Sequence, residues 1–383
     1  MNFKNMIAAY LLMALFFSAC QPSESTSEEV VDTEEVVEDT EVAKINLPDG
    51  FTMTEFAEVE NARSLALSPS GTVFIGTRNL GSVFAVKDTD GDGIADEKYV
   101  IADSLNSPNG VAFKDGDLYV AEINRILKFT DIESNLENPP AFEVVYDEYP
   151  TDGHHGWKYI AFGPDGKLYV PVGAPCNKCE SEEEIYASIT RINPDGTGME
   201  IIASGVRNTV GFDWSPTTGE LWFTDNGRDM LGDDIPPCEL NKITATGQHF
   251  GYPYCHGGNI ADPELGDKRD CDEFEKPMFN FNAHVAPLGM TFYKGNMFPE
   301  EYKGDIFVAQ HGSWNRSSKI GYRIMRMSVE NNEVTNGEVF IDGWLNDSNQ
   351  FVSGRPADVI ELPDGSLLIS DDFSGKVYRV TYN

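Results

Sequence analysis

Basic residues are scarce in this chain. Its 383 residues include 28 lysines and arginines against 63 aspartates and glutamates, which gives a formal net charge of -35 at pH 7. A field of that sign repels DNA, RNA and anionic lipid headgroups, and the sequence has no basic patch to offset it. The composition therefore excludes a nucleic-acid partner and favours a neutral or cationic small molecule as the ligand. Aromatic residues make up 11% of the chain, which supplies a large core and excludes a wholly disordered protein.

Long hydrophobic runs are also missing, apart from one at the N-terminus. Lys4 precedes an apolar run from Met6 to Phe17, and Ser18-Ala19-Cys20 follows it. This pattern predicts a lipoprotein signal peptide over residues 1–20, cleaved so that Cys20 becomes the lipidated first residue. An ordinary secretory signal with an incidental cysteine is the alternative. Both predict export, and the first predicts a lipid anchor to the bacterial cell envelope, in the periplasm or at the outer membrane.

Residues 21–45 contain no aromatic residue, and nine of the residues from Glu24 to Glu41 are acidic. Such a segment cannot bury enough apolar surface to fold. We therefore expect a disordered acidic tether over residues 21–45.

No stretch after this tether has the periodicity of an amphipathic helix. One pattern instead recurs six times: an apolar alternation, a turn rich in proline, glycine and aspartate, and a second apolar alternation. The copies span residues 65–75, 111–120, 160–170, 210–223, 290–308 and 359–369. Each copy predicts a β-hairpin, and six copies predict an all-β fold over residues 46–383, a six-bladed β-propeller, in preference to a β-sandwich. Residues 227–299 carry three cysteines and interrupt the pattern, so we expect a loop-rich insertion there.

Polar residues fill the position immediately before the first strand in most copies. They are Arg63, Asn109, His154, His155, Trp157, Lys158, Arg207, Asn208 and Arg355. Because the innermost strands of a propeller surround a central channel, these side chains should converge at one mouth of it. The result would be a basic pocket in an acidic protein, suited to a ligand with carboxylate groups. The alternative is a set of exposed loop residues with ordinary salt bridges.

Three motifs in a fixed order indicate a family. They are Gly153-His-His-Gly-Trp-Lys158, Val206-Arg-Asn-Thr-Val-Gly-Phe212 and Leu221-Trp-Phe-Thr-Asp-Asn-Gly-Arg-Asp229. With them, the sequence resembles the soluble quinoprotein glucose/sorbosone dehydrogenases, especially the sorbosone dehydrogenase-like members, which bind pyrroloquinoline quinone (PQQ) and calcium. The resemblance extends over residues 45–383. It implies that the propeller is a catalytic domain that oxidises an aldose or a sugar aldehyde and passes electrons to an unidentified acceptor.

The resemblance also implies roles for particular residues. The family's catalytic histidine falls on His155, which would take the proton of the C1 hydroxyl as hydride passes to the quinone. Calcium would be held by backbone carbonyls at Gly227 and Arg228. Guanidinium forks suit a tricarboxylate, and a cation suits the oxyanion that develops on the quinone. The implied cofactor contacts are Arg207, Asn208, Arg355, Arg78 and, in place of a family lysine, His311 or Arg316.

Two positions depart from the family pattern. Ala174 stands where the family has an acid that orients the catalytic histidine, so we expect Asp152 or another acid to take that role. Ala357 stands where the family has a second cofactor arginine, two positions after Arg355. Both departures predict that PQQ has fewer certain partners here than in the family.

A second calcium site is predicted between two strands. The segment Asp88-Thr-Asp90-Gly-Asp92-Gly-Ile-Ala-Asp96 places carboxylates at alternate positions with glycines for tight turns. This resembles an EF-hand-type loop, although the twelfth position is Tyr99 rather than glutamate. We expect a structural calcium at these four aspartates; a polar hairpin tip is the alternative.

The six cysteines include only one Cys-x-x-Cys pair, Cys176 and Cys179. A redox pair or half of a zinc site is one reading. Since cysteines of exported proteins more often form disulfides, we expect Cys176 to pair with Cys179 and Cys255 with Cys271, which leaves Cys238 unpaired.

Two other functions are compatible with a propeller. A calcium-dependent lactone hydrolase would need side-chain carboxylates around an axial metal, and the arginine, histidine and asparagine at the axial positions argue against it. A non-catalytic glycan-binding lipoprotein would bind sugar without a quinone, and Ala174 in place of the orienting acid is compatible with that function.

Overall fold

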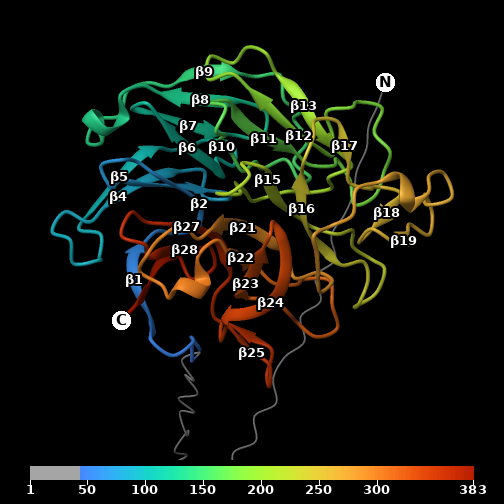
Figure 1. Cartoon of the computed structure of the whole chain (residues 1–383). Helices are drawn as coiled ribbons and strands as arrows, with labels where there is room; N and C mark the ends of the chain where they lie inside the picture. The colour runs from blue at the N-terminus through green and yellow to red at the C-terminus, as the bar shows by residue number, and fades with distance from the viewer. Residues whose placement is uncertain (1–43) are drawn as a thin grey trace, which may run out of the picture. The chain divides into compact units, whose positions relative to one another are not determined.

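The computed structural model describes residues 44–383, and all structural statements below concern those residues. The predicted signal peptide and nearly all of the predicted tether lie outside them. Six β-sheets surround a central axis (Figure 1), which confirms the predicted six-bladed β-propeller. Helical structure in residues 44–383 is limited to three 3-10 turns, η1 (Ile132–Asn135), η2 (Cys271–Glu273) and η3 (Glu300–Tyr302). No helix in this part of the chain is long and apolar enough to cross a membrane.

Most blades contain four consecutive strands. The first two blades are β2 (Ala62–Leu67), β3 (Val73–Thr77), β4 (Val83–Lys87) and β5 (Glu97–Ala102), then β6 (Gly110–Lys114), β7 (Asp117–Ala121), β8 (Ile126–Phe129) and β9 (Glu143–Tyr146). The third and fourth are β10 (Ala161–Phe162), β11 (Leu168–Val172), β12 (Ser188–Ile192), β13 (Glu200–Ser204) and β17 (Gln248–His249), then β14 (Phe212–Trp214), β15 (Leu221–Asp225), β16 (Cys238–Ile243) and β20 (Phe279–Phe281). The fifth and sixth are β21 (Pro287–Phe292), β22 (Ile306–Gln310), β23 (Arg323–Glu330) and β24 (Glu333–Ile341), then β27 (Pro356–Glu361), β28 (Leu367–Asp371), β29 (Lys376–Tyr382) and β1 (Phe51–Glu58). Two small hairpins lie outside the blades, β18 (Cys255–His256) with β19 (Ile260–Ala261), and β25 (Leu345–Asn346) with β26 (Phe351–Val352).

The six repeated units form the two inner strands of each blade. The pairs are β2–β3, β6–β7, β10–β11, β14–β15, β21–β22 and β27–β28, all antiparallel. The turn between β2 and β3 shows why the repeat keeps a glycine, since Gly71 has a φ of 89°, a left-handed conformation that side chains resist. All six predicted hairpins are therefore confirmed.

Neighbouring blades cover both faces of each sheet, which explains why the second strands are apolar without interruption. In β3, Val73 and Ile75 pack against Leu368 of the sixth blade. Phe74 points to the other face and packs against Val111 of the second blade. The same division recurs around the ring, so each large cluster of the core lies between two adjacent blades. Burying one such side chain contributes about 1.5 to 3 kcal/mol.

The N-terminal strand closes the ring. β1, blue in Figure 1, pairs with β29 near the red end of the chain, where Phe51 lies opposite Tyr382. The Phe51 ring also contacts Phe298 and Phe340 edge to face, at 4.8 and 4.9 Å between centroids. The sixth blade is therefore built from both ends of the described chain.

The predicted insertion over residues 227–299 is too wide. β16 and β20 complete the fourth blade and β21 begins the fifth, so the inserted segment is residues 244–278. The long excursion between β16 and β20 separates strands that belong to one sheet, and this hides their pairing in the sequence. Part of the excursion, β17, adds to the third blade as a fifth strand parallel to β13.

One mouth of the channel receives two sets of residues. The innermost strands begin there, and because each pairs antiparallel with the next strand, the second strands end there. Asn208, just before β14, and Asn226, just after β15, illustrate the two sets, since the Asn226 side chain donates a hydrogen bond of 2.9 Å to the Asn208 carbonyl.

Candidate active site

A cavity of about 340 Å³ opens at this mouth and is lined from five blades. Among the residues predicted for the site, the lining contains His155, Arg207, Asn208, Arg355, Arg78, His311 and Gly227, together with Arg63 and Trp157. The side chains of Arg228 and Arg316 lie elsewhere. Arg228 pairs with the buried Asp262, and Arg316 contacts Asp233 and Asp234 in a neighbouring loop. The structure thus brings most of the predicted residues together, while their chemical roles remain predictions.

His155 is a buried histidine of the cavity wall, with 8% of its surface exposed. Its φ of 50° places the backbone in the left-handed region, an uncommon conformation for a residue other than glycine. The Nδ1 atom lies 2.9 Å from the carbonyl oxygen of Ala174, so Nδ1 carries the proton and Nε2 keeps its lone pair. Burial, followed by the charge of Arg207 and the proximity of His154, lowers the pKa of His155 to about 2. The ring is therefore neutral at physiological pH.

The expected acid partner of His155 is absent from residues 44–383. Asp152 does not orient the ring and instead accepts a hydrogen bond from the hydroxyl of Tyr186. The backbone carbonyl of Ala174 takes the orienting role, which needs no particular side chain at that position. A Cβ at Gly173 would lie 2.5 Å from the Cβ of His155, so the neighbouring backbone is also shaped to admit this ring.

Arg207 is held on several sides. Its guanidinium donates to the carbonyl and side-chain oxygens of Asn177, both at 2.9 Å, to the Asn226 carbonyl at 3.1 Å and to Asp229 at 3.1 Å. The backbone of Arg207 donates to the buried Asp225 at 2.8 Å. Burial, and then the charge of Glu239, raises the pKa of Asp225 to about 7. Arg207 therefore supplies positive charge from a locked position and has few donors left for a ligand.

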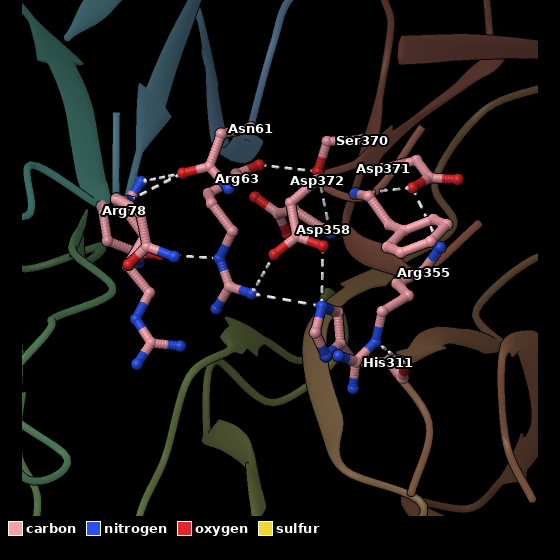
Figure 2. Close-up of polar contacts among 12 residues, drawn as sticks. Asn61, Arg63, Arg78, His311, Arg355, Asp358, Ser370, Asp371 and Asp372 are labelled. Carbon is pink, nitrogen blue, oxygen red and sulfur yellow. Dashed lines mark hydrogen bonds and ion pairs between the residues drawn. The ribbon is translucent and has the colours of Figure 1, made fainter. Parts of the chain in front are cut away.

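Asp372 joins two of the blades through Arg63 and His311. Figure 2 shows its carboxylate between them, 2.9 Å from the Arg63 guanidinium and 2.8 Å from His311 Nε2. Arg63 also donates to Asn109 at 2.9 Å. Burial lowers the pKa of His311 to about 4 although Asp372 opposes it. His311 and Arg63 hold the pKa of Asp372 below its ordinary value, against the opposing effect of its burial.

Arg355 and Arg78 have fewer side-chain hydrogen bonds within residues 44–383 than Arg207 has. Arg355 donates to the carbonyls of His311 and Gly312, both at 3.1 Å (Figure 2). The Arg78 guanidinium has no hydrogen-bond or ion-pair partner among residues 44–383 and stacks on the Trp157 ring, 3.6 Å from its centroid. Burial and then Arg63 lower the pKa of Arg78 to about 10, so it stays charged at neutral pH. Arg78 has all its donors available for an anionic ligand.

His284 is a further titratable group on the cavity wall. Its Nε2 lies 2.8 Å from the Gly232 carbonyl and its Nδ1 lies 3.5 Å from the carboxylate of Asp229. Oxygen acceptors at both nitrogens favour the imidazolium, and Asp229 raises the pKa of the ring. Asp229 is the only carboxylate among the cavity-lining residues in the described part of the chain. The lining as a whole is positive.

Gly227 is the predicted calcium-binding residue that reaches the cavity. A Cβ there would lie 2.5 Å from the Pro237 carbonyl oxygen, so the close approach of these two segments requires glycine. Neither the Gly227 nor the Arg228 carbonyl accepts a hydrogen bond from residues 44–383. Two free backbone oxygens with Asp229 beside them are ligands of the kind that calcium takes.

The predicted calcium loop joins β4 to β5. Carboxylate oxygens of Asp88, Asp90 and Asp96 lie within 4.8 Å of one another, whereas Asp92 is not part of this group. Asp92 instead accepts a hydrogen bond of 2.8 Å from the backbone of Ile94. The structure therefore places three of the four predicted ligands together, and none of the three lines the cavity.

The cysteine predictions are confirmed. Disulfides join Cys176 to Cys179 and Cys255 to Cys271. Cys238 is free and buried, and it contributes to the cavity wall.

Sequence reasoning missed two residues that follow second strands. Asp372 follows β28 and Asn226 follows β15, and both contribute to the site or its support. His311, which follows β22, was predicted from the family resemblance and not from the repeat. Antiparallel pairing brings these positions to the same mouth. Examining the residues after each second strand, as well as those before each first strand, would therefore have found them. Asn177 had no such signal, since it reaches Arg207 from an irregular loop.

Comparisons with known proteins found a matching family model and similar sequences. Residues 121–379 match the family model for Glucose / Sorbosone dehydrogenase. The chain is 36% identical over 355 residues to an uncharacterized protein of Borreliella burgdorferi. The alignment covers 88% of this chain and 91% of that protein.

Solved structures show the same fold. The holo form of the PQQ domain of pyranose dehydrogenase from Coprinopsis cinerea superposes with a TM-score of 0.77 at 17% identity, covering 89% of this chain and 97% of that one. The PQQ-bound aldose sugar dehydrogenase of Streptomyces coelicolor gives a TM-score of 0.64 at 19% identity, covering 88% and 100%. The family match extends over most of the propeller and includes the three motifs at the cavity, and on that ground the chain belongs to the glucose/sorbosone dehydrogenase family.

Proposed function

We propose that the protein is an exported dehydrogenase that uses PQQ and calcium to oxidise C1 of an aldose or a sugar aldehyde. One observation carries the proposal: a buried, neutral histidine with a free Nε2 faces a cavity in which guanidinium groups outnumber carboxylates. Membership of the family supports an oxidoreductase that acts on sugars. Export and a lipid anchor at Cys20 belong to the proposal through the N-terminal sequence alone.

The lining fits a planar tricarboxylate. Arg78 offers a guanidinium without a hydrogen-bond or ion-pair partner among the described residues, and the stacked face of Trp157 lies beside it. The Trp157 Nε1 group is buried and has no hydrogen-bond partner in residues 44–383, so it too offers a donor to a ligand. Arg355 and Asn208 complete the set of groups that would hold the cofactor, and Arg207 would act through its charge.

Chemistry at the sugar depends on His155 and on the charge around it. When bound, PQQ supplies a two-electron acceptor for the hydride of C1, and calcium polarises it. His155 Nε2 takes the hydroxyl proton of C1, so the C1–H and O–H bonds break as the C1=O bond forms. The Ala174 carbonyl, which accepts from Nδ1, stabilises the imidazolium that results. The electrons then pass to an unidentified acceptor.

The lactone hydrolase alternative is not favoured by this geometry. Such an enzyme needs several side-chain carboxylates around an axial metal. In the described part of the chain, Asp229 is the only carboxylate that lines the cavity.

Reconstitution tests the proposal. The purified protein is incubated with calcium and PQQ, offered a panel of aldoses and sugar aldehydes, and assayed by dye reduction. We expect reduction with at least one sugar, dependent on both additions and on His155. Absence of reduction with every sugar, while a sugar still binds, would favour the glycan-binding alternative.

A further inference from the structure

Trp314 stands out at the mouth of the cavity. It lines the cavity, yet 68% of its surface is exposed, more than for any other large hydrophobic side chain in residues 44–383. The indole is the largest apolar side chain and is normally buried, so exposure beside a ligand cavity indicates a contact surface.

The loop that carries Trp314 is fastened on both sides of it. On one side, the Ser313 amide donates to the Ile320 carbonyl at 2.9 Å, and the Tyr322 hydroxyl donates to the Ser313 carbonyl at 2.6 Å. On the other, the Ser317 amide donates to the Asp233 carboxylate at 3.0 Å. The backbone on both sides of the exposed ring is therefore held in place, which lowers the entropic cost of ordering this loop when a ligand stacks on the ring.

The two residues proposed to contact a sugar, His155 and Trp314, lie at different depths in the cavity. His155 is 8% exposed at the inner wall, and Trp314 is 68% exposed at the rim. In a pyranose ring C1 and C4 lie at opposite ends. A sugar whose C1 reaches His155 therefore directs its O4 toward the mouth, and a residue linked through O4 continues toward the rim.

Two more exposed rings lie next in sequence to residues that contact the Trp314 loop, and neither of them lines the cavity. Phe351 is 56% exposed and Phe373 is 60% exposed. Each lies beside a residue bonded to the Trp314 loop: Lys319 donates to the neighbouring Gln350, and His311 contacts Asp372. Separate aromatic faces interspersed with amides and carboxylates suit a sugar chain, whose rings have apolar C–H faces and polar edges, better than the continuous apolar patch of a protein partner.

We propose that Trp314 is a stacking platform for the second residue of a 1,4-linked oligosaccharide, whose reducing end enters the cavity for oxidation. The inference rests on the proposed function for the direction of the chain. It names the substrate class as reducing ends of short glycans rather than free hexoses, and it makes Trp314 a specificity-determining residue.

Chain-length kinetics test this platform. Glucose, maltose, maltotriose, cellobiose and cellotriose are compared as substrates of the reconstituted wild type, Trp314→Ala, Trp314→Phe and Phe142→Ala. Phe142 is an exposed ring on the outer edge of the second blade and outside the cavity lining, so its variant is the matched control. We expect Trp314→Ala to lower kcat/KM for at least one 1,4-linked series by about 5- to 20-fold and to change that for glucose by less than about twofold, with Trp314→Phe recovering part of the loss.

A binding measurement separates the platform from the proposed reaction. The chain has five tryptophans, and fluorescence is titrated with maltotriose or cellotriose in protein that holds no quinone. A change in emission that Trp314→Ala abolishes and Phe142→Ala keeps would support the platform, even if no sugar were oxidised. Oxidation that does not depend on chain length or on Trp314 would overturn it, and so would a Trp314→Ala defect confined to reduction of a protein acceptor.

Discussion

In the proposed function, His155 is prepared for proton transfer without a carboxylate partner. The Ala174 carbonyl sets the tautomer, and burial beside Arg207 keeps the ring neutral. A carboxylate partner would have raised the pKa of the histidine, whereas a carbonyl orients it with less effect on its charge. The arrangement thus gives a base that is available at low pH but intrinsically weak.

Replacing His155 should separate chemistry from binding. We expect His155→Gln to lower kcat by about 100- to 10,000-fold, because the proton of the C1 hydroxyl loses its acceptor. Cofactor affinity should change little, since the guanidinium groups remain. Steady-state kinetics and a PQQ titration on the same protein measure both. Equal losses in kcat and in PQQ affinity would show that His155 only shapes the pocket.

The same pKa predicts an unusual pH profile. A histidine of ordinary pKa would lose base function below about pH 6.5. Since the pKa of His155 is lowered to about 2, the unprotonated ring persists, and kcat/KM should stay level down to about pH 4. An acid limb near pH 6.5 that disappears in His155→Gln would contradict this.

At the scale of the element, the loop closed by Cys176 and Cys179 is a clamp for Arg207. Asn177 lies inside that loop and accepts two hydrogen bonds from the guanidinium. We expect a Cys176→Ser/Cys179→Ser variant to loosen Asn177 and weaken PQQ binding by about tenfold, the equivalent of one lost charge-assisted hydrogen bond.

The other disulfide supplies the matched control. Cys255 and Cys271 close a longer loop, so Cys255→Ser/Cys271→Ser should lose at least as much stability. Neither cysteine is a hydrogen-bond partner of the Arg207 guanidinium within residues 44–383, and PQQ affinity should be retained. Weakening of PQQ binding in proportion to the loss of Tm in both variants would argue against a local clamp.

Lys158 precedes the third blade and holds the turn that carries His155. It is 1% exposed, its Nζ donates to the Gly156 carbonyl at 2.9 Å, and no carboxylate of residues 44–383 pairs with it. Burial lowers its pKa to about 7. Below that pH the folded state must bury an ammonium group, and the cost disappears above the ordinary lysine pKa, where both states are neutral.

Substituting Lys158 should therefore raise the stability of the protein and lower its activity. We expect Lys158→Met to raise the free energy of unfolding by about 2 to 4 kcal/mol at pH 7 or below, with the gain shrinking toward about pH 10. Turnover should fall because Gly156 loses its anchor. Urea unfolding at several pH values measures the first effect, and Lys114→Met, at a half-buried lysine that pairs with Asp115, is the control. A gain that does not vary with pH would show that the charge of Lys158 is not the cause.

For the whole molecule, the repeats in the sequence were enough to predict the six blades, because each hairpin carries its own turn and apolar pattern. Convergence of Arg63, His155, Arg207 and Arg355 followed from the symmetry of that fold. The supporting contacts could not be predicted in the same way. The Ala174 carbonyl is a backbone group without a side-chain signature, and Asn177 reaches the site from an irregular loop.

The net charge of the whole chain predicts which electron acceptors approach the proposed enzyme fastest. The formal net charge of the chain is -35 at pH 7. Its field therefore repels an anionic acceptor and attracts a cationic one. We expect reduction of ferricyanide to accelerate several-fold, and reduction of a cationic phenazinium dye to slow, as salt is raised from about 10 to about 200 mM. Stopped-flow reduction of each dye measures this. Parallel salt dependences for the two dyes would contradict it.

The most direct test of the account is a PQQ titration of the purified protein in calcium, for wild type, Arg78→Met and Arg269→Met. Arg269 is half-buried in the inserted segment, where it pairs with Glu273 and stacks on Phe274, so its variant removes the same charge outside the cavity lining. We predict one PQQ per chain, a quinone absorbance that bleaches when a sugar substrate is added, and binding weakened about 10- to 100-fold in Arg78→Met alone. No saturable binding, or equal affinities in all three proteins, would contradict the claim that this cavity holds the cofactor.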